Sequence, residues 1–136
     1  MTSGYSATPL AQKLGIKPGT RVKTRRVPAN YLELLAPLPD GCRVASRLRP
    51  PVDIFHTFVN TRRDLEQALC DGMKQIHSAG MIWVSWPKKS SGVASEITED
   101  VIRSMALPRG LVDVKVCAVD DTWSGLKLVI RMENRK

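Results

Sequence analysis

The longest apolar runs in the chain predict two buried strands with a helix between them. Residues 52–59 (VDIFHTFV) and 81–86 (MIWVSW) are nearly continuous and rich in β-branched and aromatic side chains, which is typical of interior parallel strands. The polar segment between them predicts a helix that is capped by Thr61 and ends at His77–Gly80. Its apolar positions recur at helical spacing: Leu65, Leu69, Met73 and Ile76.

Shorter patterns predict the remaining elements. A helix is expected after Thr8, with Pro9 as its first residue and Gly15 as its end. The other expected helices are 30–35 and 98–106, and the other expected strands are 20–27, 42–48, 112–119 and 125–132. Only the turn 120–124 separates the last two strands, which is typical of an antiparallel pair.

Strands that alternate with helices predict an α/β fold: a three-layer, Rossmann-like, mainly parallel sheet with right-handed crossovers and an antiparallel C-terminal strand. The length of 136 residues fits one domain over 1–136, with residues 1–19 packing on it as a short helix and turn. The topology over residues 20–132 resembles a reduced class I S-adenosylmethionine methyltransferase.

The methyltransferase resemblance implies three cofactor motifs, and the chain departs from each. The turn after the first strand (25–31, RRVPANY) has no glycine for close backbone approach to a ligand. The second strand ends in a basic segment, 47–50 (RLRP), instead of an acidic residue for ribose. Asn60-Thr61-Arg62 stands where an Asn/Asp-Pro-Pro-aromatic loop is common. We therefore expect no cofactor and favour a non-catalytic role over an enzyme.

A second resemblance is carried by six short motifs. They are SGYS (3–6), TPLA (8–11), KLGI (13–16), WVSWPKK (83–89), VKVCAVD (114–120) and TWSGLK (122–127). The chain thus resembles a bacterial family of small stand-alone proteins catalogued as a domain of unknown function. This resemblance implies a bacterial cytoplasmic protein and brings no activity, cofactor or catalytic residue.

The net charge of +8 comes from the first half of the chain. Residues 1–63 hold 11 Lys and Arg against three acidic residues, whereas residues 64–136 hold ten of each sign. Such a distribution suits an anionic partner, and a solvated basic face is the alternative. The candidate nucleic-acid contacts are Arg25, Arg26, Arg47, Arg49, Arg62 and Arg63. Because Tyr31 is the only aromatic residue between 21 and 49, we expect weak, phosphate-directed binding at most.

Ligands of open parallel sheets bind beyond the carboxyl ends of the strands. We expect Trp86 and Trp123 to face each other at that edge and to line a small pocket for an anionic ligand. The other candidate lining residues are Asn60, Lys88, Lys89, Asp120 and Asp121. A divergent transferase that uses the same edge is the alternative function, and a purely structural role of both tryptophans in capping the core is the simpler one.

Several other sites are disfavoured by spacing. Cys42, Cys70 and Cys117 form no CxxC pair, and no His or Cys spacing suits a metal. The loop 87–92 (PKKSSG) lacks the glycine that precedes the lysine in a phosphate loop. Ser85-x-x-Lys88 falls in a strand, so it does not suit serine acylation.

The remaining predictions concern the two histidines and the cellular location of the protein. His56 is expected to be a packed core residue, and His77 is expected in the last turn of a helix, where a cation suits the dipole. No run is long enough to span a bilayer, and MTSGYSATPL lacks signal-peptide features, so a cytoplasmic location is expected. The sequence favours a ligand- or partner-binding module whose partner it does not identify.

Overall fold

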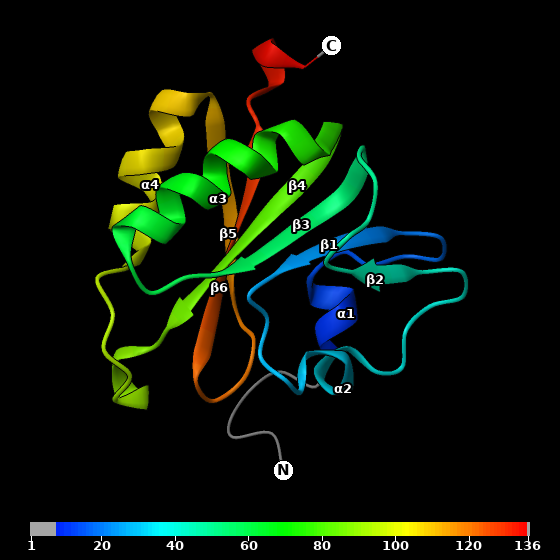
Figure 1. The fold of residues 1–136 in the computed structure, drawn as a ribbon, viewed down its shortest axis with the longest axis horizontal. Coiled ribbons are helices and arrows are strands. Elements are labelled where there is room, and N and C mark those ends of the chain that lie inside the picture. The colour runs from blue at the N-terminus through cyan, green and yellow to red at the C-terminus, as the bar shows by residue number, and fades with distance from the viewer. Residues whose placement is uncertain (1–7, 136) are drawn as a thin grey trace.

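The computed structural model describes residues 8–135, so the SGYS motif at residues 3–6 lies outside the described part. One six-stranded sheet has the order β2-β1-β3-β4-β6-β5 (Figure 1). The strands are β1 Arg21–Arg25, β2 Arg43–Ala45, β3 Val52–Phe58, β4 Ile76–Pro87, β5 Leu111–Ala118 and β6 Trp123–Ile130. The helices are α1 Leu10–Lys13, α2 Tyr31–Leu35, α3 Arg62–Gln75 and α4 Glu99–Ala106. Short 3-10 turns occupy Lys89–Ser91, Leu107–Arg109 and Met132–Asn134.

The strand directions confirm the expected topology. β2, β1, β3 and β4 are parallel, and β6 runs antiparallel between β4 and β5. The chain is therefore an α/β protein with a mainly parallel, Rossmann-like sheet and a reversed C-terminal strand.

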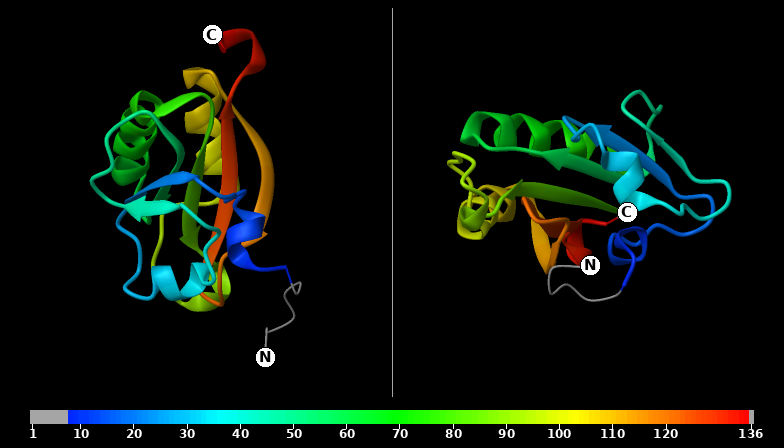
Figure 2. Two further views of the ribbon diagram at one scale, coloured as in Figure 1. Left: turned by 90° about the vertical axis from the view of Figure 1, so that its right-hand side faces the viewer. Right: turned by 90° about the horizontal axis from the view of Figure 1, so that it is seen from below.

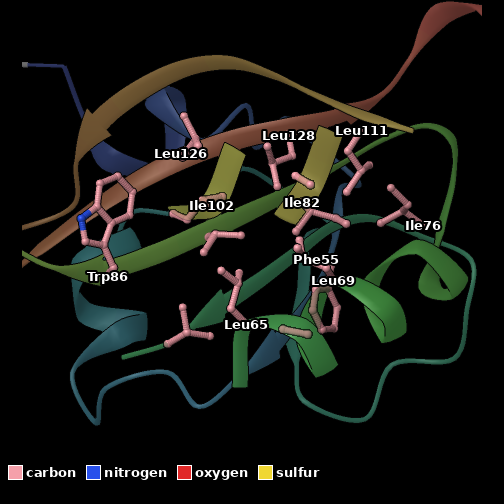
Figure 3. Packing of buried hydrophobic residues seen from close by; sticks show 14 of the residues in the cluster. Phe55, Leu65, Leu69, Ile76, Ile82, Trp86, Ile102, Leu111, Leu126 and Leu128 are labelled. Atoms are coloured by element: carbon pink, nitrogen blue, oxygen red, sulfur yellow. The ribbon is translucent and has the colours of Figure 1, made fainter. Parts of the chain in front are cut away.

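Apolar side chains cover the sheet on both faces. On one face α3 and α4 close a core that includes Phe55, Leu69 and Ile102 (Figure 3). The short helices α1 and α2 lie on the other face (Figure 2). Leu14, at the end of α1, and Tyr31 of α2 are buried there against the sheet. Burial of these side chains supplies the main driving force for the three-layer arrangement.

The helix starts at Thr61 and Thr98 agree with the sequence. Thr61 Oγ1 accepts a hydrogen bond from Asp64 N (3.1 Å), and Thr98 Oγ1 accepts one from Val101 N (3.2 Å). The assignment of Thr8 as a cap is wrong, because α1 begins at Leu10 with Pro9 as its cap residue and no side chain capping it.

The expected break at His77–Gly80 is instead part of β4. Val52 pairs with Ile76 while Ile54 pairs with Met81, so residues 77–80 form a large bulge within the strand. His77 therefore does not lie in a last helical turn: its Nε2 is 2.8 Å from Asp53 Oδ1 and its Nδ1 accepts from Ala79 N. This pair of hydrogen bonds fixes the bulge.

The β2–β3 connection also differs from the sequence-based prediction. The expected strand 42–48 shortens to Arg43–Ala45, and residues 46–51 then cross β1 as a coil. Parallel strands usually need a helical crossover that covers the sheet. α3 covers β3 and β4, and in the described part of the chain this coil passes over β1 on the same side (Figure 1).

Candidate functional site

β1 presents cations toward the face that this coil crosses. Its two inner positions on the opposite face, Val22 and Thr24, are buried. The alternate positions Arg21, Lys23 and Arg25 are only half-buried. Successive side chains of a strand point to opposite faces, so the three cations lie in a row on the α3 side.

The three cations form hydrogen bonds and an ion pair with the coil and with α3. Arg21 Nη2 donates to Arg49 O (2.7 Å), and Lys23 Nζ donates to Leu48 O (3.0 Å). Lys23 Nζ also reaches Gln75 of α3 (2.9 Å). Arg25 Nη1 forms an ion pair with Asp71 Oδ2 of α3 (2.8 Å). The cations are thus held in place before any partner binds.

A groove of about 260 Å³ lies among these side chains. We call it the β1 groove, and it is lined by Lys23, Thr24, Arg25, Ser46, Phe55, Asp71 and Gln75. It offers an ammonium, a guanidinium, an amide and a hydroxyl, with one carboxylate, Asp71. Such a set can hydrogen-bond and neutralise a carboxylate or phosphate group.

The six predicted nucleic-acid residues gather around the coil and the start of α3. Arg26 is paired with Asp64 in the first turn of α3 (3.2 Å), and Arg25 is paired with Asp71. The remaining four side chains are exposed on the coil and on α3: Arg47, Arg49, Arg62 and Arg63. Two of the six charges are therefore already partly neutralised, and the nucleic-acid role itself stays a prediction.

The expectation that Trp86 and Trp123 face each other is wrong. Trp86 pairs with Ser124 and Pro87 pairs with Trp123, so the two indoles point to opposite faces of the sheet. Trp86 lies in the core under α3 and α4 (Figure 3). Trp123 packs edge-on against Phe58 on the other face, with ring centroids 4.9 Å apart. The two rings do not line one pocket.

The other residues that were predicted to line this pocket lie in separate parts of the structure. Asp120 Oδ1 accepts from the backbone N of Thr122 and Trp123, which builds the β5–β6 turn, while exposed Asp121 follows it. Lys88 N donates to Thr122 O, and Lys89 begins an exposed 3-10 turn. Asn60 lines a separate hollow of about 340 Å³, together with Thr61, Ala94, Ser95 and Glu96. Ligand binding by these residues stays a prediction.

A second hollow lies at the carboxyl ends of β1 and β2, where Rossmann-like folds bind ligands. Its volume is about 330 Å³, and its lining is mainly apolar: Thr24, Val27, Pro28, Ala29, Tyr31, Leu32, Val44 and Ala45. The bordering loop has Arg26 in the left-handed region (φ 58°). None of the lining residues is acidic or glycine.

A hydrogen-bonded chain of polar side chains lies on the α1/α2 face of the sheet behind this hollow. Tyr31 Oη lies 2.7 Å from His56 Nδ1, and His56 Nε2 lies 2.8 Å from Ser85 Oγ. All three residues are buried. Burial lowers the pKa of His56 to about 3 and raises the pKa of Tyr31. The expectation of a packed, hydrogen-bonded core histidine is confirmed.

Comparison with known proteins identifies the family. The family model described as a protein of unknown function (DUF3052) matches residues 54–132, which is more than half of the chain. The chain belongs to the DUF3052 family. No curated protein gives a significant match. The match covers all but the start of β3 and continues through β6, and it leaves β1 and β2 outside its range. Of the β1 groove it includes Phe55, Asp71 and Gln75.

Solved structures similar to this DUF3052 chain include methyltransferases. A S-adenosylmethionine-dependent methyltransferase from Aquifex aeolicus has a TM-score of 0.66 at 14% identity, with 93% of this chain and 90% of that chain covered. Aeropyrum pernix fibrillarin with natively bound S-adenosyl-L-methionine has a TM-score of 0.63 at 13% identity, with 88% of this chain and 73% of that chain covered. TrmN from Thermus thermophilus has a TM-score of 0.57 at 11% identity, with 90% of this chain and 47% of that chain covered. At these identities the similarity shows a methyltransferase-like fold alone.

The carboxyl edge of this DUF3052 chain does not fit S-adenosylmethionine. Side chains of Val27, Pro28 and Ala29 stand where a glycine-rich loop would let the backbone approach the cofactor. No acidic residue lines the hollow to accept hydrogen bonds from ribose hydroxyls, and Tyr31 Oη is already bonded to His56. The fold is present without the groups that recognise the cofactor in such folds.

Within residues 8–135, no three His, Cys, Asp or Glu residues group in a way that could hold a metal ion. No helix in this range is long and apolar enough to cross a membrane. Sequence reasoning missed the α3 side of the β1 groove, Asp71 and Gln75. Their spacing of four residues on one helix face was a signal, but their partners on β1 are about 50 residues away in the chain.

Proposed function

We propose that this DUF3052 chain is a non-catalytic module that binds an acidic segment of a partner protein. The binding surface is the basic face, defined as the α3-side cations of β1 and the neighbouring arginines: Arg21, Lys23, Arg25, Arg43, Arg47 and Arg49. The observation that carries the proposal is the row of three half-buried cations on β1, over which residues 8–135 place a coil instead of a crossover helix.

Two features of this surface suit an extended acidic peptide. The cations of β1 are held by backbone carbonyls and by α3, so little side-chain entropy is lost when a carboxylate binds. β2 pairs only with β1, so its outer edge leaves backbone groups available for an added strand. Arg43 and Arg47 are exposed beside this edge and can pair with acidic side chains of that strand.

A non-catalytic role is supported by the chemistry of the carboxyl edge. The hollow there does not fit the methyl donor of the similar structures, and the Tyr31–His56–Ser85 chain is buried. The Trp86/Trp123 pocket that was predicted for a divergent transferase is not formed, because the two rings point to opposite faces of the sheet.

Nucleic acid is the second candidate partner, because four exposed arginines lie on the coil after β2 and at the start of α3: Arg47, Arg49, Arg62 and Arg63. Single-stranded nucleic acid binding usually adds base stacking on aromatic side chains. Phe55, the aromatic residue that lines the β1 groove, is only 2% exposed. This favours a protein partner over nucleic acid.

Fluorescence anisotropy with a labelled oligoglutamate peptide tests the proposal. We expect salt-dependent binding that weakens about tenfold, ~1.4 kcal/mol, in the double variant Arg47→Gln/Arg49→Gln. Lys115→Gln removes one charge from the opposite face and serves as the control with unchanged affinity. Absence of peptide binding at low salt contradicts the proposal. Tighter binding of single-stranded DNA with the same number of charges selects the second candidate.

A further inference from the structure

The two faces of the outer strand β2 differ in chemistry. Arg43 pairs with Arg21 of β1, so both side chains lie on the α3 side of the sheet as part of the basic face. The next residue, Val44, pairs with Val22, whose side chain is buried on the α2 side. Successive side chains of a strand point to opposite faces. A strand added beside β2 would therefore meet cations on one face of the sheet and apolar side chains on the other.

The apolar face of β2 borders the hollow of about 330 Å³ at the carboxyl ends of β1 and β2, which we call the apolar hollow. Val44 lines it together with Leu32 of α2, and the Leu32 side chain is 57% exposed. The loop after β1 adds Val27, Pro28 and Ala29. None of the lining residues is charged. Such a hollow beside a free strand edge suits an aliphatic or aromatic side chain of a partner.

The backbone of Val44 faces the outer edge of β2. Arg43 N donates to Thr20 O (3.0 Å), so the backbone groups of Arg43 point toward β1. Since the groups of consecutive residues in a strand point to opposite edges, the N–H and C=O of Val44 point away from β1. In the sheet formed by the described residues, β1 is the only neighbour of β2. A partner strand can therefore form hydrogen bonds to Val44.

We propose that the acidic segment bound by this chain alternates acidic and apolar residues, with an apolar residue opposite Val44 and an acidic residue on each side of it. The inference rests on the proposed function and adds the specificity of the same surface. Residues opposite each other in a sheet share a face, so the apolar side chain enters the apolar hollow. Its two neighbours then lie on the α3 side, where Arg43 and Lys23 complement their charge. A carboxylate directed into the uncharged hollow would lose hydration without gaining a partner.

Fluorescence anisotropy with two labelled peptides of identical composition tests this pattern. Glu-Val-Glu-Val-Glu-Val-Glu has the alternation, whereas Glu-Glu-Val-Val-Val-Glu-Glu has no apolar residue between two acidic ones. At equal salt concentration we expect about tenfold tighter binding of the alternating peptide. Leu32→Ser should reduce this preference to less than about threefold. Met132→Ser changes another exposed apolar side chain, outside the hollow, and should leave the preference unchanged.

Hydrogen exchange of the Val44 amide provides a second readout. Its rate should fall at least about tenfold in the complex with the alternating peptide, because the N–H then donates to the added strand. Unchanged exchange in the saturated complex overturns the inference. So does equal binding of the two peptides, or a preference that Leu32→Ser leaves intact, and in these cases the proposed function still stands. Failure of both peptides and of oligoglutamate to bind at low salt overturns the proposed function as well.

Discussion

Protonation of His56 is expected to link folding stability to pH. The side chain is fully buried between Tyr31 Oη and Ser85 Oγ, and burial lowers its pKa to about 3. In the unfolded chain a histidine has a pKa of about 6.5. Below pH 6.5 the unfolded state therefore binds a proton that the folded state does not bind. The free energy of unfolding falls as pH drops from about 6.5 toward the folded pKa.

The size of this effect follows from the two pKa values. Each pH unit between them changes the free energy of unfolding by about 1.4 kcal/mol, so at pH 5 the loss from His56 is about 2 kcal/mol. Urea unfolding, followed by tryptophan fluorescence at pH 7 and pH 5, measures it. His56→Gln keeps a neutral hydrogen-bonding side chain without the titration. Its loss of stability between the two pH values should be about 2 kcal/mol smaller than that of wild type.

Comparison with the variant isolates His56, because the other titrating groups contribute equally to both chains. Equal losses of stability in wild type and His56→Gln between pH 7 and pH 5 would refute the reasoning. Tyr31→Phe is the matched control. It leaves His56 Nδ1 without its partner and should cost about 1–3 kcal/mol at pH 7, while the pH dependence stays close to that of wild type.

Three further outcomes are expected. Thr61→Ala removes the cap of α3 and should lower the free energy of unfolding by about 1 kcal/mol in urea titration, whereas no change would contradict the capping role. Gly72→Ala places a Cβ 2.9 Å from the Phe55 ring and 3.0 Å from Ile82, so it should cost about 1–3 kcal/mol, with exposed Cys70→Ala on the same helix as a near-neutral control. S-adenosylmethionine should leave the Tm unchanged, since a ligand that binds raises it, and a dose-dependent increase would contradict the misfit at the carboxyl edge.

The sequence was sufficient to predict most elements of the fold. The continuous apolar runs of β3 and β4, the caps Thr61 and Thr98 and the short turn between β5 and β6 each act within a few residues of chain. Local signals of this kind identify strands and helices and, through their alternation, the parallel sheet. The methyltransferase-like topology followed from that order and is confirmed by the similar structures.

The candidate pocket could not be predicted because it depended on a register between strands that are distant in sequence. β4 and β6 are neighbours, but no turn connects them, so nothing local fixes the pairing of Pro87 with Trp123. A shift of one residue would move Trp123 to the other face of β6. The bulge at residues 77–80 was missed for a similar reason, since it depends on the contact of His77 with Asp53 on another strand.

The basic face was only partly visible in the sequence. The charged residues in 20–27 were evident in the sequence. Whether they form a binding surface depended on which face of β1 a helix covers. The crossover after β2 is a coil, so the alternate positions of β1 carry cations where a covered strand would carry apolar side chains. The side chains that complete the groove, Asp71 and Gln75, come from α3 and required the tertiary structure.

The most direct test of the central claim is a nuclear magnetic resonance titration of the isotopically labelled chain with oligoglutamate. The account predicts that the backbone amide signals of β1, β2 and residues 46–49 shift on binding, and that raising the salt concentration reverses the shifts. It also predicts little change at the loops after β3 and β4. Shifts confined to those loops, or no shifts at low salt, would contradict the assignment of the basic face as the binding surface.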